Sequence, residues 1–187
     1  MIARLVTVLL PFLILLPAPA RAQTLDIAVS SDAARLQYGS DVLGGSLGRL
    51  EGTGGLLYNG DDDFLFNLGL QVRGENLDAP VLAALGLRLY VGDAGNDSVT
   101  GLALGGELTF SPDAAPGLEL GAYLYFAPDP LAFSDISGLI DWGVRVGYQI
   151  IPLSTLYVGY QRVAVDLERG GEYELDDSVV VGLRLAF

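Results

Sequence analysis

In the last residues of the chain, large apolar side chains alternate with other residues, a pattern that few folds accommodate. Every second side chain from Val179 to Phe187 is large and apolar. These apolar residues are Val179, Val181, Leu183, Leu185 and Phe187, and Val180, Gly182, Arg184 and Ala186 stand between them. Because successive side chains of a strand point to opposite faces, the segment predicts a strand with one hydrocarbon face. A final amphipathic strand that ends on an aromatic ring is typical of a transmembrane β-barrel, in which a closed sheet satisfies its own backbone groups.

The composition limits the chemistry that is available to the chain. The 187 residues suffice for one barrel domain and include no cysteine, no histidine and no lysine. This excludes a disulfide framework and a Cys or His metal site, and we expect no cofactor. The net charge of −13 argues against nucleic acid as a partner, because phosphate binding needs a basic face. The mean hydropathy is high, at +0.43, yet beyond residue 22 no apolar run approaches the roughly 18 residues of a membrane helix.

Residues 1–22 have the pattern of a signal peptide. Arg4 supplies a short positive region, an apolar core follows from Leu5 to Leu16, and Ala20 and Ala22 are small residues at cleavage-site spacing. We predict cleavage after Ala22, which leaves a mature domain of residues 23–187. The loss of Arg4 and Arg21 moves the net charge from −13 to −15. The alternative, an uncleaved anchor, is disfavoured because a core of about twelve residues is too short to span a membrane.

The mature chain shows alternating segments of about 7 to 14 residues that are separated by turns, without helical periodicity. The segments predict an antiparallel transmembrane barrel, all-β, of ten strands, or of eight if the first hairpin lies outside the wall. The expected strands lie near residues 25–29, 36–38, 48–58, 64–73, 81–91, 102–110, 118–126, 141–149, 155–166 and 173–187. Residues 40–46 are expected to be irregular, and residues 160–163 interrupt the alternation in a way that suggests a bulge.

Connection lengths predict how the barrel is oriented. Bacterial barrels keep both termini and their short turns in the periplasm and their longer loops outside. This places residues 75–79, 111–117 and 151–154 in the periplasm, and 59–63, 92–98, 127–137 and 168–174 outside. Asp61, Asp62 and Asp63 could offer oxygen ligands to a divalent cation, but a solvated acidic turn is the simpler interpretation and we expect no metal.

Several short sequences carry a family resemblance. They are Ser31-Asp32-Ala33-Ala34-Arg35 followed by Tyr38, the acidic turn Asp61–Asp63, Tyr123-Leu124-Tyr125-Phe126-Ala127-Pro128-Asp129, Tyr157-Val158-Gly159-Tyr160-Gln161 and the terminal Phe187. With these residues the mature chain resembles the YfaZ-type outer-membrane proteins of Gram-negative bacteria. The resemblance implies an outer-membrane β-barrel and carries over no catalytic residue. The end of the chain also resembles the signal read by the barrel-assembly machinery at Gly182, Leu185 and Phe187, although Val180 stands where a polar residue is usual.

Opposite charges collect on the second face of the alternating segments. The candidates for a charge network in the lumen are Arg73, Arg88, Glu107, Glu119, Asp141, Arg145 and Arg184, which Arg49 and Glu51 join if the third strand has the parity we favour. A charge that faces lipid at mid-membrane costs about 2–4 kcal/mol, so these residues should face inward. Paired charges and tyrosines would plug a narrow interior, whereas unpaired charges would line a selective pore. We favour the plug, because small barrels rarely leave a continuous water path.

Aromatic residues predict where the membrane boundaries lie. Phe64, Phe126, Trp142, Tyr148, Tyr157 and Phe187 are candidates for a girdle at the headgroup level, with ordinary lipid-facing bulk as the alternative.

The sequence therefore predicts an exported, integral outer-membrane barrel with a non-enzymatic, structural or surface-interaction role. Its expected partners are outer-membrane lipid and, during insertion, the assembly machinery, and we expect a monomer. The alternative is a narrow small-solute channel. A lipid-acting enzyme is least favoured, because histidine is absent and Glu107 with Glu119 is the one inward carboxylate pair for acid–base work.

Overall fold

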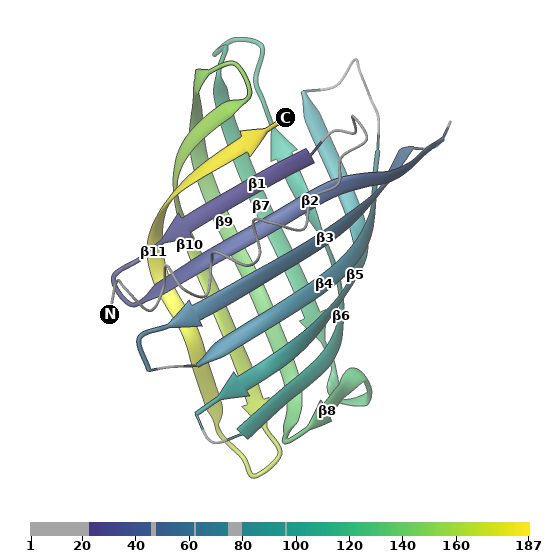
Figure 1. Ribbon diagram of the computed structural model, residues 1–187, viewed down its shortest axis with the longest axis vertical. Coiled ribbons are helices and arrows are strands. Elements are labelled where there is room, and N and C mark those ends of the chain that lie inside the picture. The colour runs from purple at the N-terminus through teal and green to yellow at the C-terminus, as the bar shows by residue number, and fades with distance from the viewer. Residues whose placement is uncertain (1–22, 46–47, 62, 75–79, 96) are drawn as a thin grey trace.

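The computed structural model describes residues 23–45, 48–61, 63–74, 80–95 and 97–187, which form an antiparallel barrel (Figure 1). The strands are β1 (Gln23–Val29), β2 (Ala33–Gly45), β3 (Gly48–Asn59), β4 (Phe64–Arg73), β5 (Val81–Ala94), β6 (Asp97–Phe110), β7 (Leu118–Ala127), β8 (Ala132–Ser134), β9 (Ile136–Ile151), β10 (Ser154–Leu167) and β11 (Glu172–Ala186). A 3₁₀ helix, η2 (Asp129–Leu131), precedes β8. Within these residues no helix is long and apolar enough to cross a membrane. The proposed signal peptide, residues 1–22, lies outside the described residues.

The ends of the sheet meet, so the barrel is closed. The strand order is β5-β4-β3-β2-β1-β11-β10-β9-β7-β6, and β5 pairs with β6 to complete the circle. The prediction of a ten-stranded antiparallel barrel is confirmed, and the first hairpin belongs to the wall. The short β8 pairs with β6 alone, at Val99 to Gly101. Gln23 and Phe187 exchange backbone hydrogen bonds of 2.9 Å, so the first residue of β1 and the last residue of the chain lie at one end of the barrel, here called the terminal end; the opposite end is the far end.

Two details of strand geometry were predicted less well. Residues 40–46 were expected to be irregular, but β2 continues to Gly45. The disturbance in the sequence pattern is a β-bulge, because Asp41 pairs with Glu51 and Leu43 with Leu50, which leaves Val42 without a partner. The bulge suggested for residues 160–163 lies between Val163 and Ala164, where the extra residue belongs to β11 and is Leu175.

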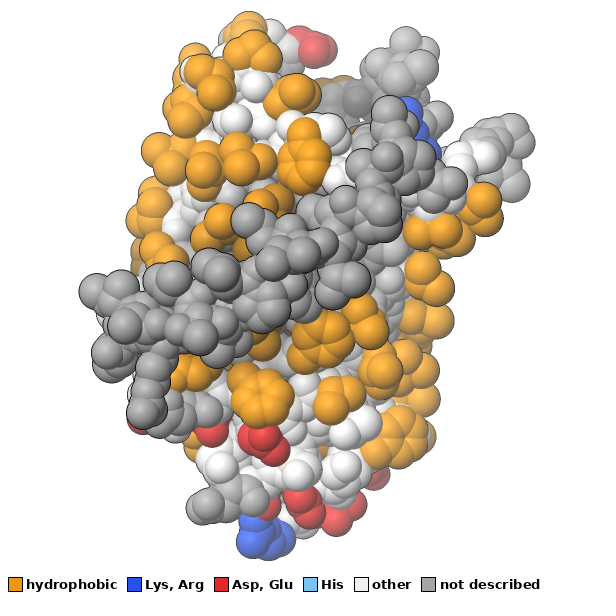
Figure 2. All heavy atoms as spheres, in the orientation of Figure 1, with side chains coloured by type: hydrophobic (Ala, Val, Ile, Leu, Met, Phe, Trp, Pro, Cys, Tyr) orange, Lys and Arg blue, Asp and Glu red, His pale blue; other side chains and the backbone are white. Residues whose placement is uncertain are grey.

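The outer face of the barrel is apolar, as the period-two pattern requires. On β9, for example, Val144, Val146 and Tyr148 are exposed, whereas the intervening residues face inward. Figure 2 shows hydrophobic side chains over most of the visible described surface, and charged side chains mainly toward the two ends. Removing such a surface from water is the main gain available to the barrel in a bilayer.

The interior is divided along its length. Buried apolar side chains fill the far half, among them Leu57, Leu65, Val99, Ile136, Leu139, Val163 and Val165, here called the far core. They come from β3, β4, β6, β9 and β10, so side chains from both sides of the barrel meet in the lumen. Toward the terminal end the interior becomes polar, and the candidate site lies there.

Candidate functional site: a polar cavity beneath an apolar core

A cavity of about 620 Å³ occupies the terminal half of the lumen. Pro80, Ser111 and Asp113, which lie at the terminal end of the barrel, belong to its lining. Arg35, Arg88 and Tyr123 also belong to its lining. None of the residues of the far core lines it. The cavity therefore lies between the terminal end and a layer of polar side chains in the middle of the barrel.

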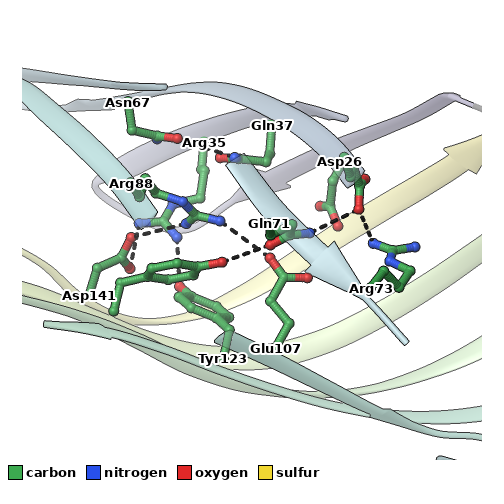
Figure 3. A network of polar contacts seen from close by, with 12 residues as sticks. Asp26, Arg35, Gln37, Asn67, Gln71, Arg73, Arg88, Glu107, Tyr123 and Asp141 are labelled. Atoms are coloured by element: carbon green, nitrogen blue, oxygen red, sulfur yellow. Dashed lines mark hydrogen bonds and ion pairs between the residues drawn. The ribbon is translucent and has the colours of Figure 1, made fainter. Parts of the chain in front are cut away.

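A buried carboxylate organises this middle layer. Asp141 of β9 is 0% exposed and accepts hydrogen bonds from Tyr90 Oη at 2.7 Å and Arg35 Nη2 at 2.9 Å. Arg88 Nη1 lies 3.8 Å from the same carboxylate. Figure 3 shows Arg35 and Arg88 converging on Asp141 from different strands. A buried charge is tolerated where it is paired and hydrogen-bonded, and Asp141 meets both conditions.

From Arg88 of β5, the contacts of this layer continue to β6 and β7 and then to β4 and β3. Arg88 donates to Glu107 Oε1 at 3.3 Å, and its guanidinium lies 3.7 Å from the centre of the Tyr125 ring, a cation–π distance. Tyr125 donates to Gln71 Oε1 at 2.8 Å, and Gln71 donates to Glu51 Oε2 at 2.9 Å. Charged, amide and aromatic groups thus form a continuous chain of contacts across the lumen.

Ion pairs also line the walls of the cavity nearer the terminal end. Arg73 Nη2 lies 2.7 Å from Glu51 Oε2. Arg184 donates to Asp26 Oδ2 at 3.0 Å and to Glu119 Oε1 at 3.4 Å. The nearest carboxylate oxygen recorded for Arg145 is Glu119 Oε1, at 3.8 Å from its Nε, which is beyond hydrogen-bond distance.

All seven charged residues proposed from the sequence take part in these ion pairs; they are Arg73, Arg88, Glu107, Glu119, Asp141, Arg145 and Arg184. Glu51 joins them, but Arg49 is half exposed at the rim, with Asp41 3.2 Å away. Sequence reasoning missed Asp26 and Arg35. In the sequence both residues alternate with apolar neighbours, so the period-two argument that identified the other seven charged residues could have found them.

The prediction that Tyr157 faces lipid is wrong. Tyr157 is only 7% exposed and donates a hydrogen bond to Asp26 inside the barrel. In the register it stands between Gly147 of β9 and Gly182 of β11. Two neighbours without side chains leave room inside for the ring, while Leu156 and Val158 occupy the outward positions.

The other girdle candidates lie on the outer face, at two levels. Phe64 and Phe126 are exposed near the far end, and Tyr148 and Phe187 near the terminal end. Trp142 is half-buried and packs against Tyr160, with the ring centroids 5.5 Å apart. Among the residues of the assembly signal, Phe187 is exposed and Leu185 partly so, whereas Gly182 faces the lumen beside Tyr157. Their roles remain predictions.

The acidic turn between β3 and β4 holds the far end together. Asp63 is buried and accepts hydrogen bonds from the backbone N–H of Gly95 at 2.9 Å and from Tyr173 Oη at 2.6 Å. Asn59 also donates to Asp63, at 3.4 Å. The Asp63 carboxylate therefore links the β3–β4 turn to the β5–β6 turn and to the start of β11. Asp62 lies outside the described residues.

Comparison with protein families finds a match over most of the chain. The family model described as YfaZ precursor matches residues 10–187. No curated protein matches the chain.

Three solved structures illustrate the likeness in fold. The outer membrane channel DcaP of Acinetobacter baumannii has a TM-score of 0.47 at 16% identity; the match covers 87% of this chain and 54% of that one, so the chain spans about half the length of the channel. A membrane protein described under "Unveiling the Mechanism Behind the in-meso Crystallization of Membrane Proteins" has a TM-score of 0.47 at 14% identity, with 89% and 83% covered. The NanC porin has a TM-score of 0.38 at 12% identity, with 89% and 98% covered. At such identities, function has to be argued from the residues of this chain.

Proposed function

The chain belongs to the YfaZ family and is an exported outer-membrane protein, and we propose that it acts as a sealed, non-enzymatic barrel with a structural or surface-interaction role. The observation that carries the proposal is the far core. Side chains such as Leu139, Val163 and Ile136 are almost fully buried inside the lumen. A packed apolar layer offers no hydrogen-bonding or charged partner to water or to ions.

The polar layer beneath the far core supports the same proposal. An ion that passed through the middle of the barrel would have to displace Asp141 from Arg35 and Tyr90. Breaking one partner out of a buried ion pair costs about 3–5 kcal/mol. The apolar far core and the ionic layer beneath it would each oppose the passage of an ion, which favours a plugged lumen over an open pore.

The state of the carboxylates supports a role without catalysis. Glu107 and Glu119 were the inward pair available for acid–base work, and each lies within hydrogen-bond distance of an arginine, Arg88 and Arg184 respectively. Each of these carboxylates is therefore engaged in a structural, charge-assisted contact. The chain also lacks histidine.

A narrow small-solute channel is the second candidate, and the cavity of about 620 Å³ is the observation that favours it. The charged cavity already occupies the terminal half of the lumen. A channel would additionally need the far core to separate, which requires concerted movement of β3 to β6 away from β9 and β10.

Conductance in planar bilayers tests the proposal. We expect the purified, folded protein to produce no current steps under conditions in which a known porin conducts. Steps that disappear when Arg88 and Arg145 are both replaced by glutamine would instead support the channel, because they would show that current passes beside these two side chains.

A further inference from the structure

Among the arginines that line the cavity, Arg145 has the weakest partner. Arg35, Arg73, Arg88 and Arg184 each have a carboxylate oxygen within 3.3 Å. Within the described residues, the carboxylate oxygen nearest to Arg145 is Glu119 Oε1 at 3.8 Å, although the Arg145 side chain is just 13% exposed. Its Nε atom is buried without a hydrogen-bond partner.

The lumen as a whole lacks acceptors rather than donors. Among the described residues, every buried side-chain polar atom without a hydrogen-bond partner is an arginine Nε. The carboxylates Asp26, Glu51, Glu107 and Glu119 are already matched, each with an arginine nitrogen within 3.4 Å. A ligand that supplied acceptor oxygens would therefore satisfy groups that the chain itself leaves unsatisfied.

Two glycines give the Arg145 side chain its position. In the ladder, Gly121 of β7 and Gly159 of β10 stand on either side of Arg145. A Cβ atom at Gly121 would lie 2.7 Å from Arg145 Nε, and one at Gly159 would lie 3.1 Å from Arg145 Cβ. Because these side chains are missing, the guanidinium lies against the wall and the cavity stays open in front of it.

Arg184 brings a second guanidinium to the same place. It donates to Glu119 Oε1 at 3.4 Å, so two arginines compete for one carboxylate oxygen. Guanidinium groups bind carboxylate and phosphate groups through paired, charge-assisted hydrogen bonds. Both arginines line the cavity, together with Tyr157.

We propose that the cavity binds a small organic anion, whose carboxylate or phosphate group is held by Arg145 and Arg184. The inference rests on the proposed function for the route of entry, which is the terminal end, since the far core closes the other end. A volume of about 620 Å³ is in the range of pockets that hold ligands of metabolite size.

Titration calorimetry of the folded protein in detergent tests the proposal, at constant ionic strength and with three probes of one ring type. Glucuronate carries a carboxylate, glucose 6-phosphate carries a phosphate, and glucose carries no charge. We expect at least one anion to bind about tenfold or more tightly than glucose. Whichever of the two anions binds more tightly identifies the group, carboxylate or phosphate, that the site prefers.

Variants locate the binding. Arg145→Gln should weaken anion binding by about tenfold or more, and Arg145→Lys should restore part of it, because lysine keeps the charge but loses the paired geometry. Arg169→Gln is the matched control, since Arg169 is 73% exposed and pairs with Asp97 at the far end. Within the described residues, the Arg145 guanidinium comes no closer to a carboxylate than 3.8 Å and its Nε donates no hydrogen bond, so Arg145→Gln should fold normally, with unchanged heat-modifiable gel migration.

The outcomes separate this inference from the sealed barrel. If no probe binds, or if anions bind equally well to Arg145→Gln, the anion site is overturned. If the wild type conducts in a bilayer, the sealed barrel is overturned, whatever calorimetry shows. Binding that depends on Arg145 in a protein that does not conduct supports both.

Discussion

Tyr90 and Asp141 meet inside the barrel, where the phenol donates to Oδ2 of the carboxylate at 2.7 Å and neither residue is reached by solvent. Tyr90 comes from β5 and Asp141 from β9, so the contact joins two strands that are not neighbours in the wall. Arg35 of β2 reaches the same carboxylate from a third direction. At this level a single side chain, that of Asp141, joins three strands of the barrel.

Replacing Asp141 by asparagine should therefore destabilise the barrel strongly. The amide is similar in size but leaves Arg35 and Arg88 without their shared negative charge, and loss of one partner of a buried pair costs about 3–5 kcal/mol. Urea unfolding in lipid vesicles, followed by the fluorescence of the single tryptophan, Trp142, measures the change. Asp129→Asn is the control, because Asp129 is exposed in η2 and should change stability by less than about 0.5 kcal/mol. Equal stability of the Asp141 variant and the wild type would contradict the role given to this network.

Gly182→Ala should disturb packing inside the barrel. A Cβ atom there would lie 2.2 Å from Cζ of Tyr157, and overpacking of this kind costs about 1–3 kcal/mol. Tyr157→Val in the same chain removes the clash and should restore most of the lost stability. The fraction of folded protein after refolding into lipid, read from gel migration, measures both effects. If the double variant refolds no better than the single one, packing against Tyr157 is not the reason for glycine at this position.

Asp63→Ala should loosen the far end without affecting the rest of the barrel. The substitution leaves the N–H of Gly95 and the hydroxyl of Tyr173 without an acceptor, and an unsatisfied buried group costs about 1–3 kcal/mol. Limited proteolysis of the folded protein should show faster cleavage near the turns that Asp63 joins. Asp61→Ala serves as the control because Asp61 is exposed in the same turn. Equal cleavage of the two variants would rule out the linking role of Asp63.

The same contact predicts a dependence on alkaline pH. Tyr173 lies beyond the apolar outward run of β11, and its hydrogen bond to Asp63, aided by burial, raises the pKa of its phenol from 10.0 to about 12. The folded state keeps the proton longer than the unfolded state, so this contribution to stability is complete below pH 10 and is lost as the pH rises through about 12. Difference absorbance between the wild type and Tyr173→Phe isolates the titration of this phenol. A midpoint near 10 would mean that the hydrogen bond is absent in solution.

Much of the fold could be predicted because strand geometry has a period of two. Once Val144 and Val146 are assigned to the lipid face, Asp141 and Arg145 have to face the lumen, whatever the neighbouring strands do. The same rule allowed ten strands to be counted and seven charged residues to be assigned to the lumen. It failed at residues 40–46, where the bulge at Val42 shifts the alternation by one residue. At Tyr157 the alternation with Leu156 and Val158 does point inward, and the error was to assign the aromatic ring to the membrane boundary.

Sequence alone thus determined the closed sheet, its apolar exterior and seven of the charged side chains that enter the lumen, because each follows from local alternation and from the need to satisfy the backbone in lipid. Only the tertiary structure decided which arginine meets which carboxylate, that Asp26 and Arg35 complete the set, and that apolar residues gather in one half of the lumen and charges in the other. Those arrangements depend on strand register and on distances across the barrel. Residues such as Arg35 and Asp141, which are 106 positions apart in the chain, are brought within 2.9 Å only when the sheet closes.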